Sequence, residues 1–135
     1  MALLREDAFR VGCETDRFWC AREARRFASE VGFAELAQWE IAIVVAELVA
    51  NAVRHAGSGT VTFRRAPGPR AGMQIVVANE SGEVATAGPA ERAPAAGARR
   101  GLGLGLKTVR LLTDSVSIEA GVRGLVVTAS RYLAP

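Results

Sequence analysis

The sequence predicts a two-layer α/β sandwich, in which a mixed, mostly antiparallel sheet of about five strands carries three helices on one face. Short segments with alternating apolar residues and longer segments with apolar residues three and four apart have the periods of strands and of amphipathic helices. Their order is one strand, two helices, two strands, one helix and two strands, which suits helices packed on one side of a sheet. The length of 135 residues suits a single domain, residues 1–135.

Each expected element is bounded by a capping residue or a turn. Gly32 and Gly57 lie where a glycine ends a helix, and the second helix is apolar almost all round, so it should lie deep in the protein. Residues 80–100 show no periodicity and are expected to form a loop. In chain order the expected elements are a strand over Phe9–Glu14, a helix from Thr15 or Asp16 to Val31, a helix over Ala34–Ala56, strands over Thr60–Arg65 and Met73–Asn79, a helix over Leu104–Thr113, and strands over Ser115–Ala120 and Leu125–Leu133.

Composition and charge argue against several classes of protein but do not identify the function. The net charge of +3 comes almost entirely from arginines, which are scattered without interleaved aromatic residues, so a nucleic-acid interface ranks third behind the two functions considered below. Cys13 and Cys20 with one histidine make neither a disulfide framework nor a metal set, which indicates buried, reduced thiols in the cytoplasm. No apolar run reaches the roughly 18 residues that span a bilayer, so no membrane is expected.

A polar stripe crosses the most apolar predicted helix. In the segment ELVANAVRH, Glu47, Asn51 and His55 are four residues apart, so they share one face within an arc of about 80°, about 6 Å apart per step. A buried carboxylate is costly unless something pairs with it. A cavity that holds a cation and phosphates would account for the stripe, with a base, a hard oxygen ligand for Mg²⁺ and a donor to phosphate. Alternatively, the stripe lies at a solvated edge of the helix.

A glycine run, RRGLGLGLK, is the second signal. The segment Gly101–Gly105 lets the backbone approach a ligand closely, and its N–H groups lead into the start of a helix, an arrangement that favours phosphate. Its GxGxG spacing, without a strand immediately before it, disfavours a dinucleotide site, and it lacks the G-K-[ST] of a Walker loop. Taken alone, the run is equally consistent with a hinge or with tight helix–sheet packing.

Together the two signals resemble the Bergerat-fold (GHKL) ATPases, and within them the small anti-sigma serine kinases of bacterial stress-response partner switching. The likeness covers nearly the whole chain. It rests on EVGF at Glu30–Phe33, the helix Ile41–Gly57, the glycine run followed by VRLLTD at Val109–Asp114, and a last strand that ends in an aromatic residue, Tyr132.

The resemblance implies phosphoryl transfer from ATP with Mg²⁺, in which catalysis is mostly positioning and charge stabilisation. Glu47 matches the family's catalytic base, which takes the proton from a substrate serine, and Asn51 matches the Mg²⁺ ligand. Glu80–Arg100 occupies the place of the lid over ATP. The cofactor-binding residues expected from the resemblance are Asn51, His55, Asn79, Gly101, Leu102, Gly103, Leu104, Gly105, Lys107 and Thr128.

The adenine-binding elements depart from the family pattern. Where the family has Asp-x-Gly-x-Gly, this chain has Asn79-Glu80-Ser81-Gly82-Glu83, and a neutral amide accepts a hydrogen bond from adenine less strongly than a carboxylate. The family usually follows its final turn glycine with threonine, whereas Leu125 follows Gly124 here and the next threonine is Thr128. We therefore expect weakened or altered nucleotide recognition with the phosphate and Mg²⁺ elements intact.

Two functional hypotheses follow. The first is a serine kinase and anti-sigma-type switch protein whose substrate is a serine on a STAS-domain anti-anti-sigma protein. The second is a degenerate module that regulates a partner, such as a PP2C-type phosphatase or a sigma factor, by docking alone. The basic side of the first helix, with Arg22, Arg25 and Arg26, is either a docking face for an acidic surface or a solvated face. The sequence leaves the oligomeric state open, a homodimer included.

Overall fold

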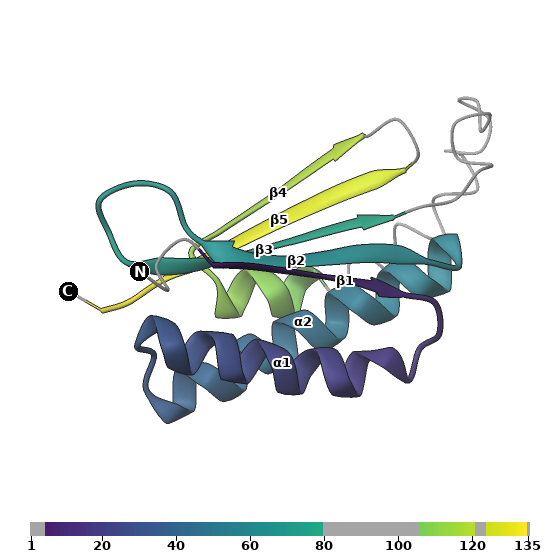
Figure 1. Ribbon diagram of the computed structural model, residues 1–135. Helices are drawn as coiled ribbons and strands as arrows, with labels where there is room; N and C mark the ends of the chain where they lie inside the picture. The colour runs from purple at the N-terminus through teal and green to yellow at the C-terminus, as the bar shows by residue number, and fades with distance from the viewer. Residues whose placement is uncertain (1–4, 80–105, 121–123, 135) are drawn as a thin grey trace.

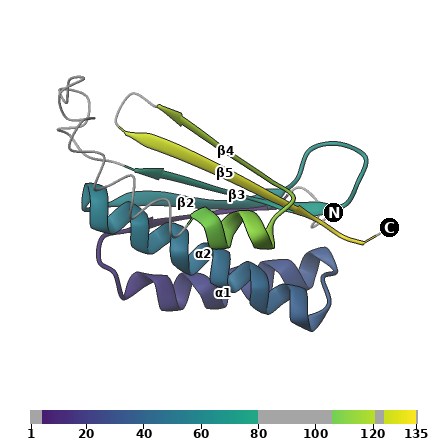
Figure 2. The same cartoon turned by 180° about the vertical axis from the view of Figure 1, so that it is seen from behind.

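The structure, a computed structural model that describes residues 5–79, 106–120 and 124–134, is a five-stranded sheet with helices packed on one face (Figures 1 and 2). The predicted fold class is confirmed. The helices are α1 (Asp16–Val31), α2 (Glu35–Ala56) and a helix over residues 106–112, and the strands are β1 (Glu6–Val11), β2 (Gly59–Arg65), β3 (Gly72–Asn79), β4 (Ser115–Ala120) and β5 (Leu125–Tyr132).

The strands lie in the order β1-β2-β3-β5-β4, and every neighbouring pair is antiparallel. The sheet is therefore antiparallel throughout, without the parallel pair that a mixed sheet would contain. β5 lies between β3 and β4, with Thr128 opposite Val76 on one side and Ser117 on the other. The last strand in the chain thus occupies an inner position in the sheet.

The core lies between the sheet and the helices. The alternation of β2 and β3 buries Val61, Phe63, Ile75 and Val77 against the helices, as expected from strand periodicity. The predicted apolar stripe of α1 is also buried, and Gly32 ends that helix at φ 119°, a left-handed conformation that glycine adopts without strain. The sequence predicts either Trp19 or Cys20 as the first member of this stripe, and its buried residues are Cys20, Ala24, Phe27, Ala28 and Val31.

The predicted position of β1 was wrong by three residues, because the strand spans Glu6–Val11 and not Phe9–Glu14. The cause is the side chain of Asp16, whose Oδ2 accepts hydrogen bonds from the backbone N–H groups of Gly12 (2.8 Å) and Cys13 (3.1 Å). These two residues form the turn into α1 instead of extending the strand. Val11 is buried, whereas Cys13, expected from the sequence to be a buried thiol, is exposed in this turn.

α2 is the core helix of the domain, and it ends at Ala56 before Gly57, as predicted. By length and composition it could cross a membrane, contrary to the expectation that no apolar run is long enough, although half of its apolar window is buried inside the fold. The expectation that it lies deep in the protein holds only in part, because three large apolar side chains of its first half are exposed. They are Leu36, Trp39 and Ile43.

Two predicted segments lie outside the described residues: the loop Glu80–Arg100 and the glycine run Gly101–Gly105. The helix expected over Leu104–Thr113 is described over residues 106–112. Leu106 and Val109 from this helix are buried in the same core cluster as the apolar residues of α2.

Candidate nucleotide site

The polar stripe predicted on α2 lies on one face of an uninterrupted helix. α2 is helical from Glu35 to Ala56, so Glu47, Asn51 and His55 follow one another along the same side, one turn apart. The side chain of Asn51 is buried, at 3% exposure, while Glu47 and His55 are half-buried. A solvated edge, the alternative considered from the sequence, therefore does not account for Asn51.

Two buried atoms of this stripe are unsatisfied. Within the described part of the chain, neither Nδ2 of Asn51 nor Nε2 of His55 has a hydrogen-bond partner. An unpaired buried polar group costs about 1–3 kcal/mol, and native proteins hold few of them. Phosphate oxygens are strong acceptors and would satisfy both atoms, so these residues fit a phosphorylated ligand.

Arg54 determines how the Asn51 amide is oriented. Its Nη1 donates to Oδ1 of Asn51 at 3.3 Å, and its Nη2 lies 3.4 Å from Oε1 of Glu14, in the turn before α1. The contact leaves the amide nitrogen of Asn51 as the unpaired atom. Sequence reasoning did not select Arg54 or Glu14. The available signal was a basic residue three positions after Asn51, on an adjacent part of the helix surface.

The environment of His55 favours its neutral form. Burial lowers the pKa of the imidazole below its ordinary value of 6.5, and the neighbouring positive charge of Arg54 lowers it further. A neutral imidazole carries one N–H donor and one acceptor, so the ring can donate to a phosphate oxygen.

A link between Glu40 and Arg131 places the helix over residues 106–112 beside the polar stripe. Arg131 pairs with Oε1 of Glu40 at 2.8 Å and donates to the backbone oxygen of Leu112 at 3.0 Å. Glu40 precedes Glu47 by two turns and lies on the same side of α2. In both views of the ribbon, the unlabelled helix between β4 and α2 is the one over residues 106–112, and it runs antiparallel to α2 (Figures 1 and 2).

The start of that helix packs into the core together with α2. Leu106, the residue directly after the glycine run, is buried in the same core cluster as Leu48, the residue that follows Glu47. The residues of the run itself, Gly101–Gly105 with Leu102 and Leu104, are outside the described part of the chain. Lys107 is exposed.

Asn79 lies on the helix-facing side of β3. Its position follows from strand alternation with Ile75 and Val77, both of which are in the core. Asn79 pairs with Gly59, and a Cβ added to Gly59 would lie 3.4 Å from Cβ of Ala52. Asn79 is therefore close to the last turns of α2.

Thr128 is not brought to this site. Its neighbours in β5, Val127 and Ala129, are buried in the core beneath the sheet, so alternation turns Thr128 to the opposite face. α2 and its polar stripe lie on the helix-covered face. We therefore exclude Thr128 from the site that the remaining residues define.

The residues at the site suit Mg²⁺ held together with phosphates better than a metal held by protein alone. Within the described residues, no group of three or more His, Cys, Asp or Glu side chains could hold a metal ion. Mg²⁺ commonly takes one or two protein oxygens and completes its shell with phosphate oxygens and water. Asn51 carries an oxygen of the hard type that such a site requires, and in this structure that Oδ1 accepts a hydrogen bond from Arg54.

The fold and the site define a small α/β domain of the nucleotide-binding ATPase class. In agreement, residues 20–131 match the family model described as the histidine kinase-like ATPase domain, and the chain belongs to this family. Family membership implies an ATP-binding, kinase-like module. No curated protein matches the chain significantly.

Proposed function

We propose that this domain binds ATP with Mg²⁺ and acts as a serine kinase and anti-sigma-type switch protein. The principal observation is the stripe of Glu47, Asn51 and His55, which holds two unsatisfied buried nitrogens beside the helix that follows the glycine run. Within the family, the sequence resembles the serine/threonine-protein kinase RsbT. We propose accordingly that the substrate is a serine on a STAS-domain anti-anti-sigma protein in a cytoplasmic partner-switching pathway.

Each residue of the stripe has a distinct part in this proposal. ATP supplies the phosphoryl group when it is bound. Asn51 would hold Mg²⁺, and His55 would donate to phosphate oxygens, which removes the cost of its unpaired ring nitrogen. Glu47, half-buried on the same face, would accept the proton of the substrate serine, a role that requires the carboxylate to be ionised.

Calorimetry tests the proposed binding of ATP, and a kinase assay tests the proposed transfer of its phosphoryl group to a protein. With the purified domain, we expect saturable binding of ATP that weakens when Mg²⁺ is removed. Glu47→Gln should retain nucleotide binding and lose phosphorylation of a STAS partner, because it removes the base without removing a ligand. Glu35→Gln is the matched control, since Glu35 is an exposed carboxylate in the first turn of the same helix. If the domain does not bind ATP at millimolar concentration, the proposed function is refuted.

The second candidate is a module that regulates a PP2C-type phosphatase or a sigma factor by docking alone. Two observations favour it: Asn79 offers adenine a neutral acceptor, and Thr128 lies on the far face of the sheet. Stable binding of such a partner by a domain that binds no ATP would identify this function. Competition between ATP and the partner would instead support a nucleotide-controlled switch.

A further inference from the structure

The outer surface of α1 and the first half of α2 combines exposed apolar and basic side chains. On α2, Leu36, Trp39 and Ile43 are 71%, 49% and 46% exposed, and their spacing of three and four residues places them in one stripe. Isolated surface apolar residues are ordinary, whereas a row of three large ones along a helix is typical of an interaction surface. We call this row, together with the adjacent arginines of α1, the α1–α2 surface.

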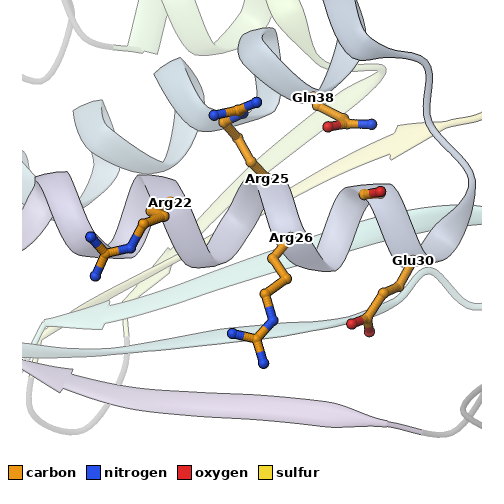
Figure 3. A pocket seen from close by; sticks show the side chains of 6 residues that line it. Arg22, Arg25, Arg26, Glu30 and Gln38 are labelled. Atoms are coloured by element: carbon orange, nitrogen blue, oxygen red, sulfur yellow. The ribbon is translucent and has the colours of Figure 1, made fainter.

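The basic part of this surface surrounds a shallow depression of about 370 Å³ between the two helices. Figure 3 shows Arg25 directed toward α2, while Arg22 and Arg26 extend in other directions from α1. Because the three guanidinium groups diverge, a single small anion cannot contact all of them. An extended acidic segment with several carboxylates can.

Arg25 joins the basic and apolar parts. Its guanidinium carbon lies 3.7 Å from the centre of the Trp39 ring, a cation–π contact that holds the side chain against α2. Its Nε is buried and, within the described residues, has no hydrogen-bond partner. A stacked arginine is pre-organised to bind a carboxylate, because little rotamer freedom remains to be lost.

We propose that the α1–α2 surface docks an amphipathic, acidic segment of a partner protein. Its apolar side chains would cover Leu36, Trp39 and Ile43, and its carboxylates would pair with Arg22 and Arg25. This surface goes beyond the proposed kinase function. Trp39 and Asn51 are twelve residues apart on α2, about 18 Å along the helix, so docking leaves the nucleotide site open.

The charge pattern favours protein over nucleic acid as the occupant. Acidic residues are interleaved with the arginines: Glu23 lies 3.7 Å from Arg26, and Glu30 pairs with Arg5. A phosphate backbone carries a negative charge at every nucleotide and cannot avoid these carboxylates, whereas a protein segment can place its acidic groups opposite the arginines and apolar groups elsewhere. Aliphatic Leu36 and Ile43 also offer no stacking surface for bases.

A peptide titration followed by NMR tests this proposal. The probe is a synthetic amphipathic helical peptide with leucines at i, i+3 and i+7 and glutamates between them. We expect saturable shifts at backbone amides of residues 22–30 and 36–43 and at the Trp39 indole. Trp39→Ala and Arg25→Gln should each weaken the peptide affinity at least about tenfold, as expected for aromatic and arginine anchors. Both variants should bind Mg²⁺-ATP with unchanged affinity.

Matched controls lie on the helix over residues 106–112, where Leu111 is 77% exposed and Arg110 is also exposed. Leu111→Ala and Arg110→Gln should leave peptide binding unchanged. The proposal is overturned if no saturable shift occurs at the α1–α2 surface at millimolar peptide, or if a peptide with lysines in place of glutamates binds equally well. Tighter binding of oligothymidylate at the same residues would also overturn it, in favour of a nucleic-acid interface.

Discussion

Nη1 of Arg54 donates to Oδ1 of Asn51 at 3.3 Å, and this contact fixes the direction of an amide in the core of the domain. Turning the amide over would place its NH₂ group against the guanidinium, so that two donors would face each other. The present direction leaves Nδ2 of Asn51 unpaired among the described residues. The folded domain therefore carries a local instability at the position where the resemblance places a metal ligand.

Replacing Asn51 should separate stability from binding. Asn51→Leu removes the unpaired donor and keeps the branched shape and number of heavy atoms of the side chain, so the free energy of unfolding should stay the same or rise by about 1–3 kcal/mol, while Mg²⁺-ATP binding is lost. Urea unfolding and calorimetry measure the two effects. Ser130→Ala is the contrast, because the buried Ser130 hydroxyl accepts from Gln74 at 3.1 Å and its loss should destabilise the fold. A large loss of stability in Asn51→Leu would contradict this account.

The pH dependence of stability should report the burial of His55. Because its pKa is lowered in the folded state, the unfolded chain binds more protons as pH falls below 6.5, and stability decreases in that range. His55→Gln should flatten the unfolding free energy between about pH 7 and pH 5. His55 is the chain's single histidine, so NMR can follow its titration directly.

Arg54→Gln should raise the pKa of His55 toward 6.5 without reaching it, because burial is the larger cause of the shift and the charge of Arg54 is the smaller one. The same NMR titration measures this change. Arg110→Gln, which removes an exposed arginine from another helix, serves as the control. Equal shifts in the two variants would mean that the charge of Arg54 does not act locally on His55.

The two cysteines should differ sharply in reactivity. Burial raises the pKa of the Cys20 thiol to about 12, while Cys13 is exposed in the turn before α1. In the native protein, a thiol reagent should therefore modify Cys13 rapidly and Cys20 only after unfolding. Cys13→Ser leaves one thiol whose labelling rate measures opening of the α1 core. Fast native labelling of that variant would contradict the burial of Cys20.

Gly72 should be intolerant of a side chain for steric reasons. A Cβ at this position would lie 2.5 Å from the backbone oxygen of Arg131 and 2.7 Å from Cδ1 of Tyr132, in the pairing of β3 with β5. Gly72→Ala should cost about 1–3 kcal/mol of unfolding free energy. Gly12→Ala, where a Cβ meets nothing within 4 Å, is the control and should be close to neutral. Similar unfolding midpoints for both variants would show that β3 and β5 adjust at no cost.

Periodicity predicted those parts of the fold that depend on burial alone. The stripe of α1 and the inward residues of β2 lie as the sequence indicated, and β4 has the predicted bounds. β1 was placed too late because the carboxylate of Asp16 takes up two backbone amides, an interaction that apolar alternation does not reveal. The exposure of Trp39 was also unpredictable, since an almost wholly apolar helix does not indicate which side is left uncovered.

The site was predictable to the extent that it lies on a single element. The spacing of Glu47, Asn51 and His55 placed them on one face of a helix, and the structure has them there. The contact of Arg54 with Glu14 joins positions 40 residues apart, so local spacing could not predict it. Thr128 was selected from the resemblance. Its neighbours Val127 and Ala129 are buried against the helices, so strand alternation places Thr128 on the opposite face of the sheet.

The inner position of β5 has a consequence for biosynthesis. β5 pairs with β3 and contributes Val127 and Ala129 to the core. Its residues leave the ribosome after all the other described strands and helices. Until then the nascent chain presents the open edge of β3 and an incompletely covered α2 to the cell. The sheet and the core of this domain are therefore completed only after β5 has been translated, and until then the emerging chain exposes apolar surface and an unpaired strand edge.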